Sequence, residues 1–519
     1  MRRGSGNTAF IGLVAMLVAL AALGWLLFDI QEQPAGGGDG QNETLFVYCA
    51  AGTRPAIQEI VDQYKAEFGV TIEIQYQGSN TLLSQIEIAS TGKANAGDVY
   101  IAADDSYIDQ AIQKGLVRES IAVARQRPVI VVQKGNPKGI TGIDDLLNKD
   151  VITALGNPDQ AAVGKVTRKL LKATSQWDQL EAHVREHGVF KPTVPEIAND
   201  VKLGTADAAI TWDATLNNYP ELEGIRVPAL DAGTANISVG ILTSTEQSAR
   251  ALHFARYISA PEKGQTILAK RGFEGTPGDP WADKPTLTFF CGAVNRAAVQ
   301  PVLDAFEVRE GVQLDVSYNG CGFLTGTMKT IQDQDTERGF PDTYMACDVY
   351  YLDVVQEWFE AGINVSDTSI VIAVPKGNPR NIRELSDLAK PGMRVAVGQP
   401  QQCTIGVLTK KLFAAEGLTD SIEPNIVAQK VSSAQLIPDV AAGAVDAVLA
   451  YATDTRAAAD RVDAIEIESQ AAIAIQPFSV ARTSRNKLLA SRLFKAIAES
   501  QSSFEAAGFH WRLNTEAAP

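Results

Sequence analysis

An internal repeat constrains the fold of this chain more than any other feature, because both copies must adopt the same arrangement of helices and strands. The segment that begins at Leu45 aligns with the segment that begins at Leu287. Both contain the pattern C-x-A-x-x-R-x-A, which begins at Cys49 and at Cys291. Further blocks recur in the same order, among them KGNP at residues 134–137 and 376–379. The sequence therefore predicts a duplication of one module.

The duplication also sets the predicted domain organisation. With 519 residues, the chain is long enough for about two to four domains of ordinary size. We assign residues 1–43 to a signal anchor and a flexible linker, 44–276 to module 1, 277–285 to a linker, 286–513 to module 2 and 514–519 to a tail.

The N-terminal segment is predicted to be a membrane anchor. Residues 9–28 carry no charge and no proline, and about 20 apolar residues at roughly 1.5 Å each span a bilayer core. Arg2 and Arg3 precede this run and Asp29 follows it, which orients the N-terminus to the cytoplasm. We therefore expect a membrane-anchored protein whose remaining residues are extracytoplasmic, on the periplasmic side. A cleaved signal peptide is the alternative interpretation.

Within each copy, short β-rich runs alternate with amphipathic helices. Residues 45–50 are a predicted strand, 55–68 a predicted helix with apolar residues at helical spacing, and 70–76 the next strand. Such units predict an α/β fold in which each module has a mixed, mostly parallel sheet with helices on both faces. Ligands of such sheets bind at the carboxyl ends of the strands, beside helix N-termini.

Composition and motifs argue against several other function classes. The formal net charge of −15 disfavours binding to nucleic acid, which requires basic surface. The four histidines lack metal-ligand spacing, and no phosphate-binding loop or nucleophile motif appears. Two carboxylate pairs are better explained by local hydrogen bonds than by acid–base catalysis; they are Asp98 with Asp104 and Asp342 with Asp348. We predict a protein that is not an enzyme and that carries no metal or cofactor.

Five short blocks of the first copy carry a resemblance to a known family. In chain order they are CAAGT, QGSNT, DVYIAAD, NPDQAAVG and AITW. Each copy resembles the type II periplasmic binding proteins, most closely the molybdate-binding subunits of ABC importers. The resemblance implies two lobes that close on a small tetrahedral oxyanion, such as molybdate or tungstate, held by backbone N–H groups and hydroxyls. It further implies an ABC importer permease as the partner.

The same resemblance implies a set of ligand-binding positions. In module 1 they are Gly52 or Thr53, Ser79, Val163 and Trp212. In module 2 they are Val294 or Asn295, Cys321, Ile405 and Tyr451. Ser79 could at the same time act as a helix N-cap, and both aromatic residues could instead be core residues at strand ends.

Both copies place an arginine at the start of the first helix, at positions Arg54 and Arg296. A guanidinium is a forked, permanently charged donor that suits oxyanions. The alternative is an exposed arginine that pairs with a nearby carboxylate, since cations are disfavoured at helix N-termini.

Cysteines distinguish the second copy from the first. Cys49 is expected to be a buried small hydrophobic residue, and Cys291 matches it. Cys321, Cys347 and Cys403 instead replace a serine and two alanines at positions near the expected cleft. Module 2 is therefore predicted to bind a different, thiophilic ligand or to hold a disulfide; unrelated buried thiols are the alternative.

The motion expected from the resemblance is lobe closure about two crossover segments in each module. They are residues 125–131 and 236–242 in module 1, and residues 369–374 and 472–478 in module 2. The alternative function is that of a membrane-tethered sensor or adaptor in which one or both modules bind no anion.

Overall fold

The computed structural model describes residues 44–92 and 96–513. The predicted anchor, its linker and the C-terminal tail lie outside these residues. No helix within the described residues is long and apolar enough to cross a bilayer.

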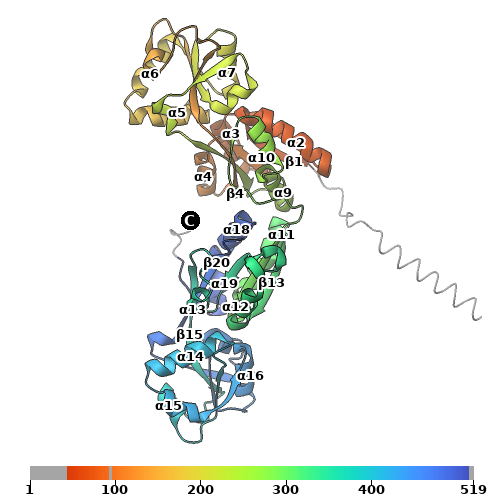
Figure 1. Cartoon of the computed structure of the whole chain (residues 1–519), viewed down its shortest axis with the longest axis vertical. Coiled ribbons are helices and arrows are strands. Elements are labelled where there is room, and N and C mark those ends of the chain that lie inside the picture. The colour runs from red at the N-terminus through yellow and green to blue at the C-terminus, as the bar shows by residue number, and fades with distance from the viewer. Residues whose placement is uncertain (1–43, 93–95, 514–519) are drawn as a thin grey trace, which may run out of the picture. The chain divides into compact units, whose positions relative to one another are not determined.

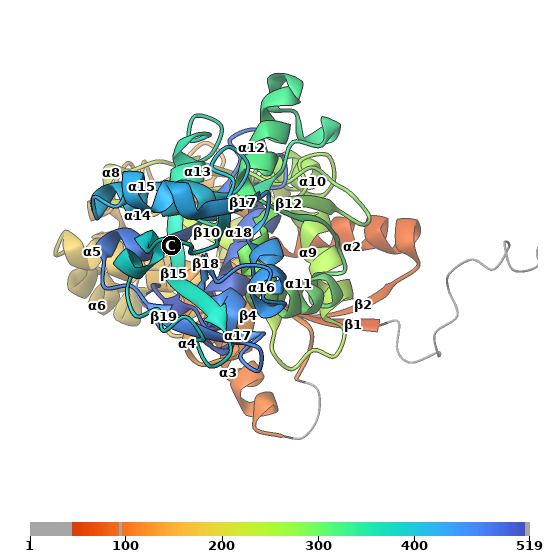
Figure 2. The same cartoon turned by 90° about the horizontal axis from the view of Figure 1, so that it is seen from below.

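Module 1 contains two sheets, each flanked by helices (Figures 1 and 2). The first sheet has the strand order β11-β4-β10-β3-β1-β2, and the second has the order β7-β6-β8-β5-β9. The strands are β1 (Thr44–Ala50), β2 (Thr71–Gln77), β3 (Val99–Ala102), β4 (Val117–Gln126), β5 (Pro128–Gln133), β6 (Thr153–Gly156), β7 (Val189–Lys191), β8 (Ala208–Trp212), β9 (Leu222–Ile225), β10 (Ala235–Leu242) and β11 (Glu274–Gly275).

The helices of module 1 divide between the two sheets. The first lobe, built on the six-stranded sheet, carries α2 (Arg54–Phe68), α3 (Ser79–Ser90), α4 (Ser106–Gln113), α9 (Ser248–Ser259) and α10 (Gly264–Lys270). The second lobe, built on the five-stranded sheet, carries α5 (Ala162–Ala173), α6 (Trp177–His187), α7 (Val194–Lys202) and α8 (Pro228–Asp231). Helix α2 confirms the helix predicted at residues 55–68.

Module 2 repeats these elements, but its strands form one ten-stranded sheet. Eight strands follow the order β13-β12-β14-β20-β15-β18-β16-β17, and β19 and β21 also pair with β15. The strands are β12 (Thr286–Gly292), β13 (Gln313–Asn319), β14 (Thr343–Met345), β15 (Ile363–Pro375), β16 (Val395–Gly398), β17 (Ile426–Lys430), β18 (Ala447–Tyr451), β19 (Val462–Glu466), β20 (Ile473–Val480) and β21 (His510–Trp511).

The helices of module 2 follow those of module 1 in order. The first lobe carries α11 (Arg296–Glu310), α12 (Cys321–Thr330), α13 (Val349–Asp353), α18 (Lys487–Ala498) and α19 (Gln501–Ala507). The second lobe carries α14 (Thr404–Ala415), α15 (Thr419–Ile422), α16 (Leu436–Ala441) and α17 (Ala452–Arg456).

The sheets are mixed, as predicted, but parallel strands do not dominate them. The strands of the β-turn-α units pair in parallel, for example β1 with β3 and β12 with β13. The strands that cross between lobes pair antiparallel with their neighbours, as β10 does with both β3 and β4. The expectation of a mostly parallel sheet was wrong because a chain that leaves a lobe and later returns inserts strands of opposite direction.

The predicted crossover segments lie where the chain passes between lobes. In module 1, β4 belongs to the first sheet and β5 to the second, and only Arg127 separates them. In module 2, β15 passes through without interruption: it pairs with β20 over residues 363–369 and with β18 over residues 370–373. The returning strands β10 and β20 cover the other two predicted segments.

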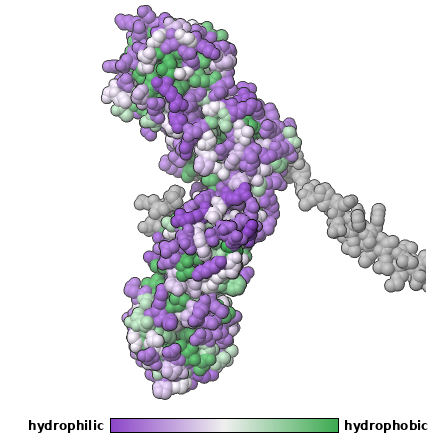
Figure 3. Space-filling view, viewed as in Figure 1, coloured by the Kyte–Doolittle hydropathy of each residue, from purple (hydrophilic) through white to green (hydrophobic). Residues whose placement is uncertain are grey.

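The apolar periodicity seen in the sequence corresponds to buried packing. On α2, the residues at helical spacing are all buried, including Ile57, Ile60 and Tyr64. Strand β3 is buried along its whole length, as expected for a strand covered on both faces. The face seen in Figure 3 is mostly hydrophilic, with scattered hydrophobic areas.

Candidate functional site

Four helix N-termini from the two lobes of module 1 come together at the predicted site. They belong to α2 and α3 of the first lobe and to α5 and α7 of the second. Gly52, just before α2, approaches Val194 at the start of α7 so closely that an added Cβ would lie 3.4 Å from the valine Cβ. At α3, the Asn80 N–H donates to the Gln160 carbonyl, two residues before α5, at 3.3 Å. The turns predicted to surround a ligand are therefore neighbours.

None of these four helices has a side-chain cap. Their N-cap residues are Thr53, Gly78, Ala161 and Thr193, and no side chain of these residues bonds to a first-turn N–H. The first N–H groups of a helix have no partner within the helix, and together with the helix dipole they favour an anion. The first turns of the four helices thus bring backbone donors from two lobes to one place, although the Arg54 and Asn80 N–H groups already donate to the Ala51 and Gln160 carbonyls.

Ser79 is the first residue of α3 and not its N-cap, which corrects the capping expectation. Gly78 occupies the cap because the backbone of the second lobe is too close for a side chain: an added Cβ would lie 2.7 Å from the Pro192 carbonyl oxygen. The Ser79 Oγ accepts the Ala103 N–H at 3.2 Å. An accepting hydroxyl keeps its own hydrogen for another acceptor.

Trp212 ends strand β8 and is 1% exposed, yet its indole Nε1 has no hydrogen-bond partner. An indole N–H only donates, and a buried donor without an acceptor costs free energy. The matching Tyr451 ends β18 in module 2 and likewise has a buried hydroxyl without a partner. A purely structural core aromatic would be expected to have its polar atom satisfied.

The other predicted contacts of module 1 offer backbone, not side chains. The Thr53 hydroxyl donates to the Ala50 carbonyl at 2.9 Å, so its hydrogen is already used. Val163 lies in the first turn of α5 and is fully buried. Gly52, Thr53 and Val163 can therefore serve a ligand through their N–H groups.

Arg54 and Arg296 occupy equivalent positions in the two modules, and both are exposed. Each guanidinium lies over a tyrosine ring, Tyr76 or Tyr318, with 5.1 Å from Cζ to the ring centroid. The arrangement differs from the alternative of a carboxylate partner, and ligand contact by these arginines stays a prediction. A cation–π contact explains why both copies keep arginine there.

Two features of module 1 were missed by the sequence analysis. The first is α7, whose N-terminus carries a proline at position 195, a usual signal for a helix start. The second is Lys165 in α5, whose Nζ donates to Ser106 Oγ of the first lobe at 2.7 Å. Burial lowers the pKa of Lys165. This contact links the two lobes directly, and no short-range sequence pattern signals it.

Module 2 brings together the equivalent elements with different side chains. Gly320 precedes α12 and approaches the Gln402 carbonyl oxygen, so that an added Cβ would lie 2.9 Å away. Val294 and Ile405 are buried, and Cys403 is the N-cap of α14 without a side-chain bond. Asn295 is fully buried; its Nδ2 donates to the Ala346 carbonyl at 3.2 Å, while its Oδ1 has no partner.

A carboxylate distinguishes the second lobe of module 2 from that of module 1. Asp454 aligns with Thr215, and its Oδ2 is buried without a hydrogen-bond partner. Burial raises the pKa of Asp454 to about 6, although a hydrogen bond from Ser433 opposes that shift. Ser433 lies in the short helix η9 (Ser433–Gln435) just before α16. A carboxylate near this helix start disfavours an anionic ligand in module 2.

Carboxylates of both predicted pairs accept hydrogen bonds, and those of Asp98 and Asp342 come from residues distant in the chain. Asp98 accepts from the Phe46 N–H and the Thr245 hydroxyl, and Asp342 accepts from the Thr288 N–H and the Ser484 hydroxyl. Asp348 caps α13 through the Tyr350 N–H at 3.0 Å. Over residues 44–92 and 96–513, no group of three or more His, Cys, Asp or Glu side chains is arranged to hold a metal ion.

Comparisons with known proteins find the same duplication. A family model described as bacterial extracellular solute-binding protein matches residues 45–274 and again residues 287–510. The molybdate-binding protein ModA of Mycobacterium bovis is 25% identical over 205 residues, 38% of this chain and 73% of that protein. ModA of Escherichia coli K12 is 26% identical over 153 residues, 28% of this chain and 58% of that protein.

Among solved structures, the periplasmic molybdate-binding protein of Azotobacter vinelandii is 17% identical, with a TM-score of 0.38. That match covers 44% of this chain and 98% of the other chain.

Proposed function

Because the chain belongs to the family of bacterial extracellular solute-binding proteins, we propose that module 1 binds a small tetrahedral oxyanion of the molybdate class and presents it to the permease of an ABC importer. The chain is a tandem type II periplasmic binding protein that resembles molybdate-binding proteins. A family of binding proteins supports a role in which no bond is made or broken. The relatives named for molybdate binding support the choice of ligand class.

The observation that carries this proposal is the meeting of four uncapped helix N-termini in module 1. An oxyanion can accept from those first-turn N–H groups of α2, α3, α5 and α7 that have no partner, and it needs no countercharge from a side chain. The Ser79 hydroxyl and the buried indole N–H of Trp212 add two donors without an acceptor for their hydrogens. Because all of these groups donate hydrogen bonds, the site favours a ligand whose oxygens only accept them.

The location of the protein is part of the proposal. An uncharged run at residues 9–28 would tether the chain to the membrane, and the glycine-rich segment after it would let the modules reach a permease. Family membership supports an extracytoplasmic location.

A thermal-shift panel of molybdate, tungstate, sulfate and phosphate tests the ligand. An anion at a hundred times its dissociation constant should stabilise module 1 by about 2.7 kcal/mol, a shift of roughly 5 to 10 °C in its unfolding transition. Ser79→Ala should weaken binding by about tenfold, because one hydrogen bond to a charged acceptor is lost. The matched variant Cys321→Ala in module 2 should leave the shift unchanged. No shift with any of the four anions would refute the proposal.

For module 2 we propose a different role, that of a module without an oxyanion. Two features favour this second function, an interaction or sensing module beside the binding module. Module 2 buries the carboxylate of Asp454, and it lacks a hydroxyl at the position of Ser79, where it has Cys321. Anion titration of the variant Ser79→Ala with Trp212→Phe tests it, since all remaining binding would then have to occur in module 2. Residual tight binding would contradict it.

A further inference from the structure

We propose that Cys321 and Cys347 form a redox pair that interconverts between two thiols and one disulfide at the cleft of module 2. The pair occupies the position where module 1 has Ser79 and Ala103. This inference goes beyond anion binding and does not depend on it.

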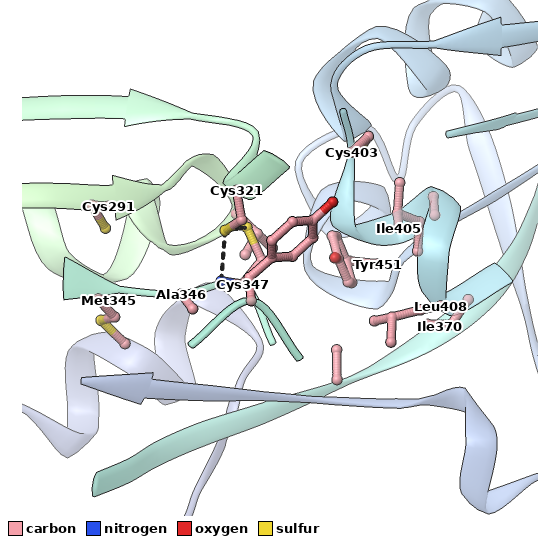
Figure 4. Close-up of a cluster of buried hydrophobic side chains, with 14 of the residues drawn as sticks. Cys291, Cys321, Met345, Ala346, Cys347, Ile370, Cys403, Ile405, Leu408 and Tyr451 are labelled. Carbon is pink, nitrogen blue, oxygen red and sulfur yellow. Dashed lines mark hydrogen bonds between the residues drawn. The ribbon is translucent and has the colours of Figure 1, made fainter. Parts of the chain in front are cut away.

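The two sulfur atoms are already in contact. Cys321 Sγ and Cys347 Sγ are 2.8 Å apart, and the Cys347 N–H donates to Cys321 Sγ at 3.0 Å (Figure 4). Cys321 is fully buried and Cys347 is 4% exposed. Cys321 begins α12 and Cys347 follows β14, so two elements of the first lobe hold the pair.

The backbone contact within the pair is inherited from the common module. In module 1, the Ala103 N–H donates to Ser79 Oγ at 3.2 Å, and in module 2 the Cys347 N–H donates to Cys321 Sγ in the same way. The shared fold therefore holds residue 321 beside residue 347 in the same way that it holds Ser79 beside Ala103. Replacing both with cysteine places two thiols side by side.

A third substitution makes room for the two sulfurs. Module 1 has Ala50 at the end of β1, whereas module 2 has Gly292 at the end of β12. A Cβ added at Gly292 would overlap Cys347 Sγ and would lie 2.9 Å from Cys321 Sγ. The space that the Ala50 methyl group occupies in one module is filled by the sulfur pair in the other. Three linked changes are harder to explain by unrelated buried thiols.

The remaining cysteines are less suited to this chemistry. Cys291 has a counterpart in module 1, Cys49, and Figure 4 shows it apart from the pair on its strand. Burial raises the pKa of Cys49 to about 12 and that of Cys403 to about 11. Cys403 belongs to the second lobe, at the N-cap of α14.

Cys321 has the better environment for the attacking thiolate. Burial opposes its charged form, but hydrogen bonds from Cys347 and other neighbours outweigh burial and lower the pKa of Cys321. The pKa of Cys347 is raised, chiefly by its hydrogen bond with Cys321 and by burial. A lowered pKa in one member of a pair is usual for thiols that react by exchange.

The reaction proceeds by thiol–disulfide exchange with a small disulfide as oxidant. Cys321 loses its proton and attacks one sulfur of the oxidant, which breaks that S–S bond and releases one thiolate. Cys347 then loses its proton and attacks Cys321 Sγ of the mixed disulfide, which releases the second thiolate. The two released thiolates take up the two protons. Two thiols of the protein are thus oxidised to one disulfide, while the disulfide of the oxidant is reduced to two thiols.

Lobe separation is the step that admits the oxidant. Gly322, next to Cys321, approaches Gln402 of the second lobe so closely that an added Cβ would lie 2.8 Å from its backbone. Opening the cleft removes this cover. The rate at which the pair is oxidised should therefore report how often the cleft of module 2 opens.

Counting thiols in the full chain tests the proposal. The folded protein is incubated with oxidised glutathione and then unfolded in acid. Its free thiols are alkylated, and the mass of the chain is measured by mass spectrometry. We expect five alkylated cysteines in the reduced protein and three after oxidation, with a crosslinked peptide that joins Cys321 to Cys347. Oxidation should also raise the unfolding temperature of module 2 by roughly 5 to 10 °C, because a native crosslink stabilises the fold.

Two kinds of variant control this experiment. Cys321→Ser and Cys347→Ala supply the residues of module 1. The first should lose no thiol on oxidation, the second should lose one as a mixed disulfide with glutathione, and Cys403→Ala should still lose two. Five alkylated cysteines in the oxidised wild-type protein would overturn the proposal. A crosslink between any other two cysteines, or a crosslink that forms only in unfolded protein, would overturn it as well.

Discussion

The two modules share one architecture, but the residues around their clefts differ in kind. Module 1 offers donors: free helix N–H groups, the Ser79 hydroxyl and the Trp212 indole. The starts of α11, α12 and α14 in module 2 also lack side-chain caps, but Cys321 and Tyr451 replace Ser79 and Trp212, and the buried carboxylate of Asp454 replaces Thr215. Both modules keep the buried apolar pattern of the fold, whereas the residues around the cleft differ between them.

The difference also shows that changes at the cleft occurred together. Gly292, Cys321 and Cys347 differ from Ala50, Ser79 and Ala103 as one set, since the methyl group of an alanine at 292 would overlap the sulfur pair. A close-packed interior responds to a volume change of one methyl group. The modules can therefore be tested by exchanging single residues between them.

The largest expected effect comes from Gly292→Ala, which places the residue of module 1 beside the thiols of module 2. We expect it to destabilise module 2 by about 3 kcal/mol, because the methyl group overlaps Cys347 Sγ. Denaturant unfolding of the full chain measures this loss. The triple variant with Cys321→Ser and Cys347→Ala should recover most of it. An unchanged stability of the single variant would show that the three substitutions are independent.

The second effect concerns pH. The pKa of Asp454 is raised to about 6, so the folded module binds this proton more tightly than the unfolded chain does. The charged carboxylate therefore lowers stability fully above pH 6, and the penalty disappears as the pH falls toward 4. Asp454→Asn should stabilise module 2 by about 2 kcal/mol at pH 7.5 and by almost nothing at pH 4.

Unfolding curves of wild type and Asp454→Asn at several pH values check this sign. Thr215→Val in module 1 is the matched control, because its hydroxyl does not titrate. If Asp454→Asn stabilised module 2 by the same amount at every pH, the stability penalty could not come from ionisation of Asp454.

The third effect is on ligand affinity. Trp212→Phe removes the buried indole N–H and should weaken anion binding by module 1 about tenfold. Tyr451→Phe removes the corresponding unpartnered hydroxyl in module 2 and should not affect anion binding at all. Titration calorimetry of both variants measures the difference. Equal losses would mean that both clefts bind the anion.

The smallest effect is expected at the lobe contact of Lys165 with Ser106. Lys165→Met should weaken anion binding about threefold, since a partly exposed contact contributes roughly 0.7 kcal/mol to closure. In module 2 the aligned residue is Val407, and Val407→Met should have no effect on anion binding. The rate of anion release, measured by stopped flow, should rise for the first variant alone.

Much of this fold could be predicted from the sequence, because the repeat aligned each strand and helix with a second copy. The helix at residues 55–68 and the crossovers were placed correctly from periodicity and from the family pattern. The direction of the strands was predicted incorrectly. The antiparallel pairing of β10 with β3, for example, depends on where the chain returns from the other lobe.

The site was predicted less completely, since its decisive contacts join residues that are distant in sequence. The cap of α3 is Gly78 because Gln160 and Pro192 come close to it from the second lobe. The residues next to Lys165 and Asp454 in the sequence give no signal of their roles. Only the fold brings Lys165 to Ser106, and only the fold buries Oδ2 of Asp454.

The number of anions bound per chain tests the central claim most directly. Titration calorimetry of the full chain with molybdate should give one anion per chain, and Ser79→Ala with Trp212→Phe should weaken that binding about a hundredfold, since each change alone weakens it about tenfold. Two anions per chain, or one anion that binds to this double variant as tightly as to the wild-type chain, would contradict a donor-lined site confined to module 1.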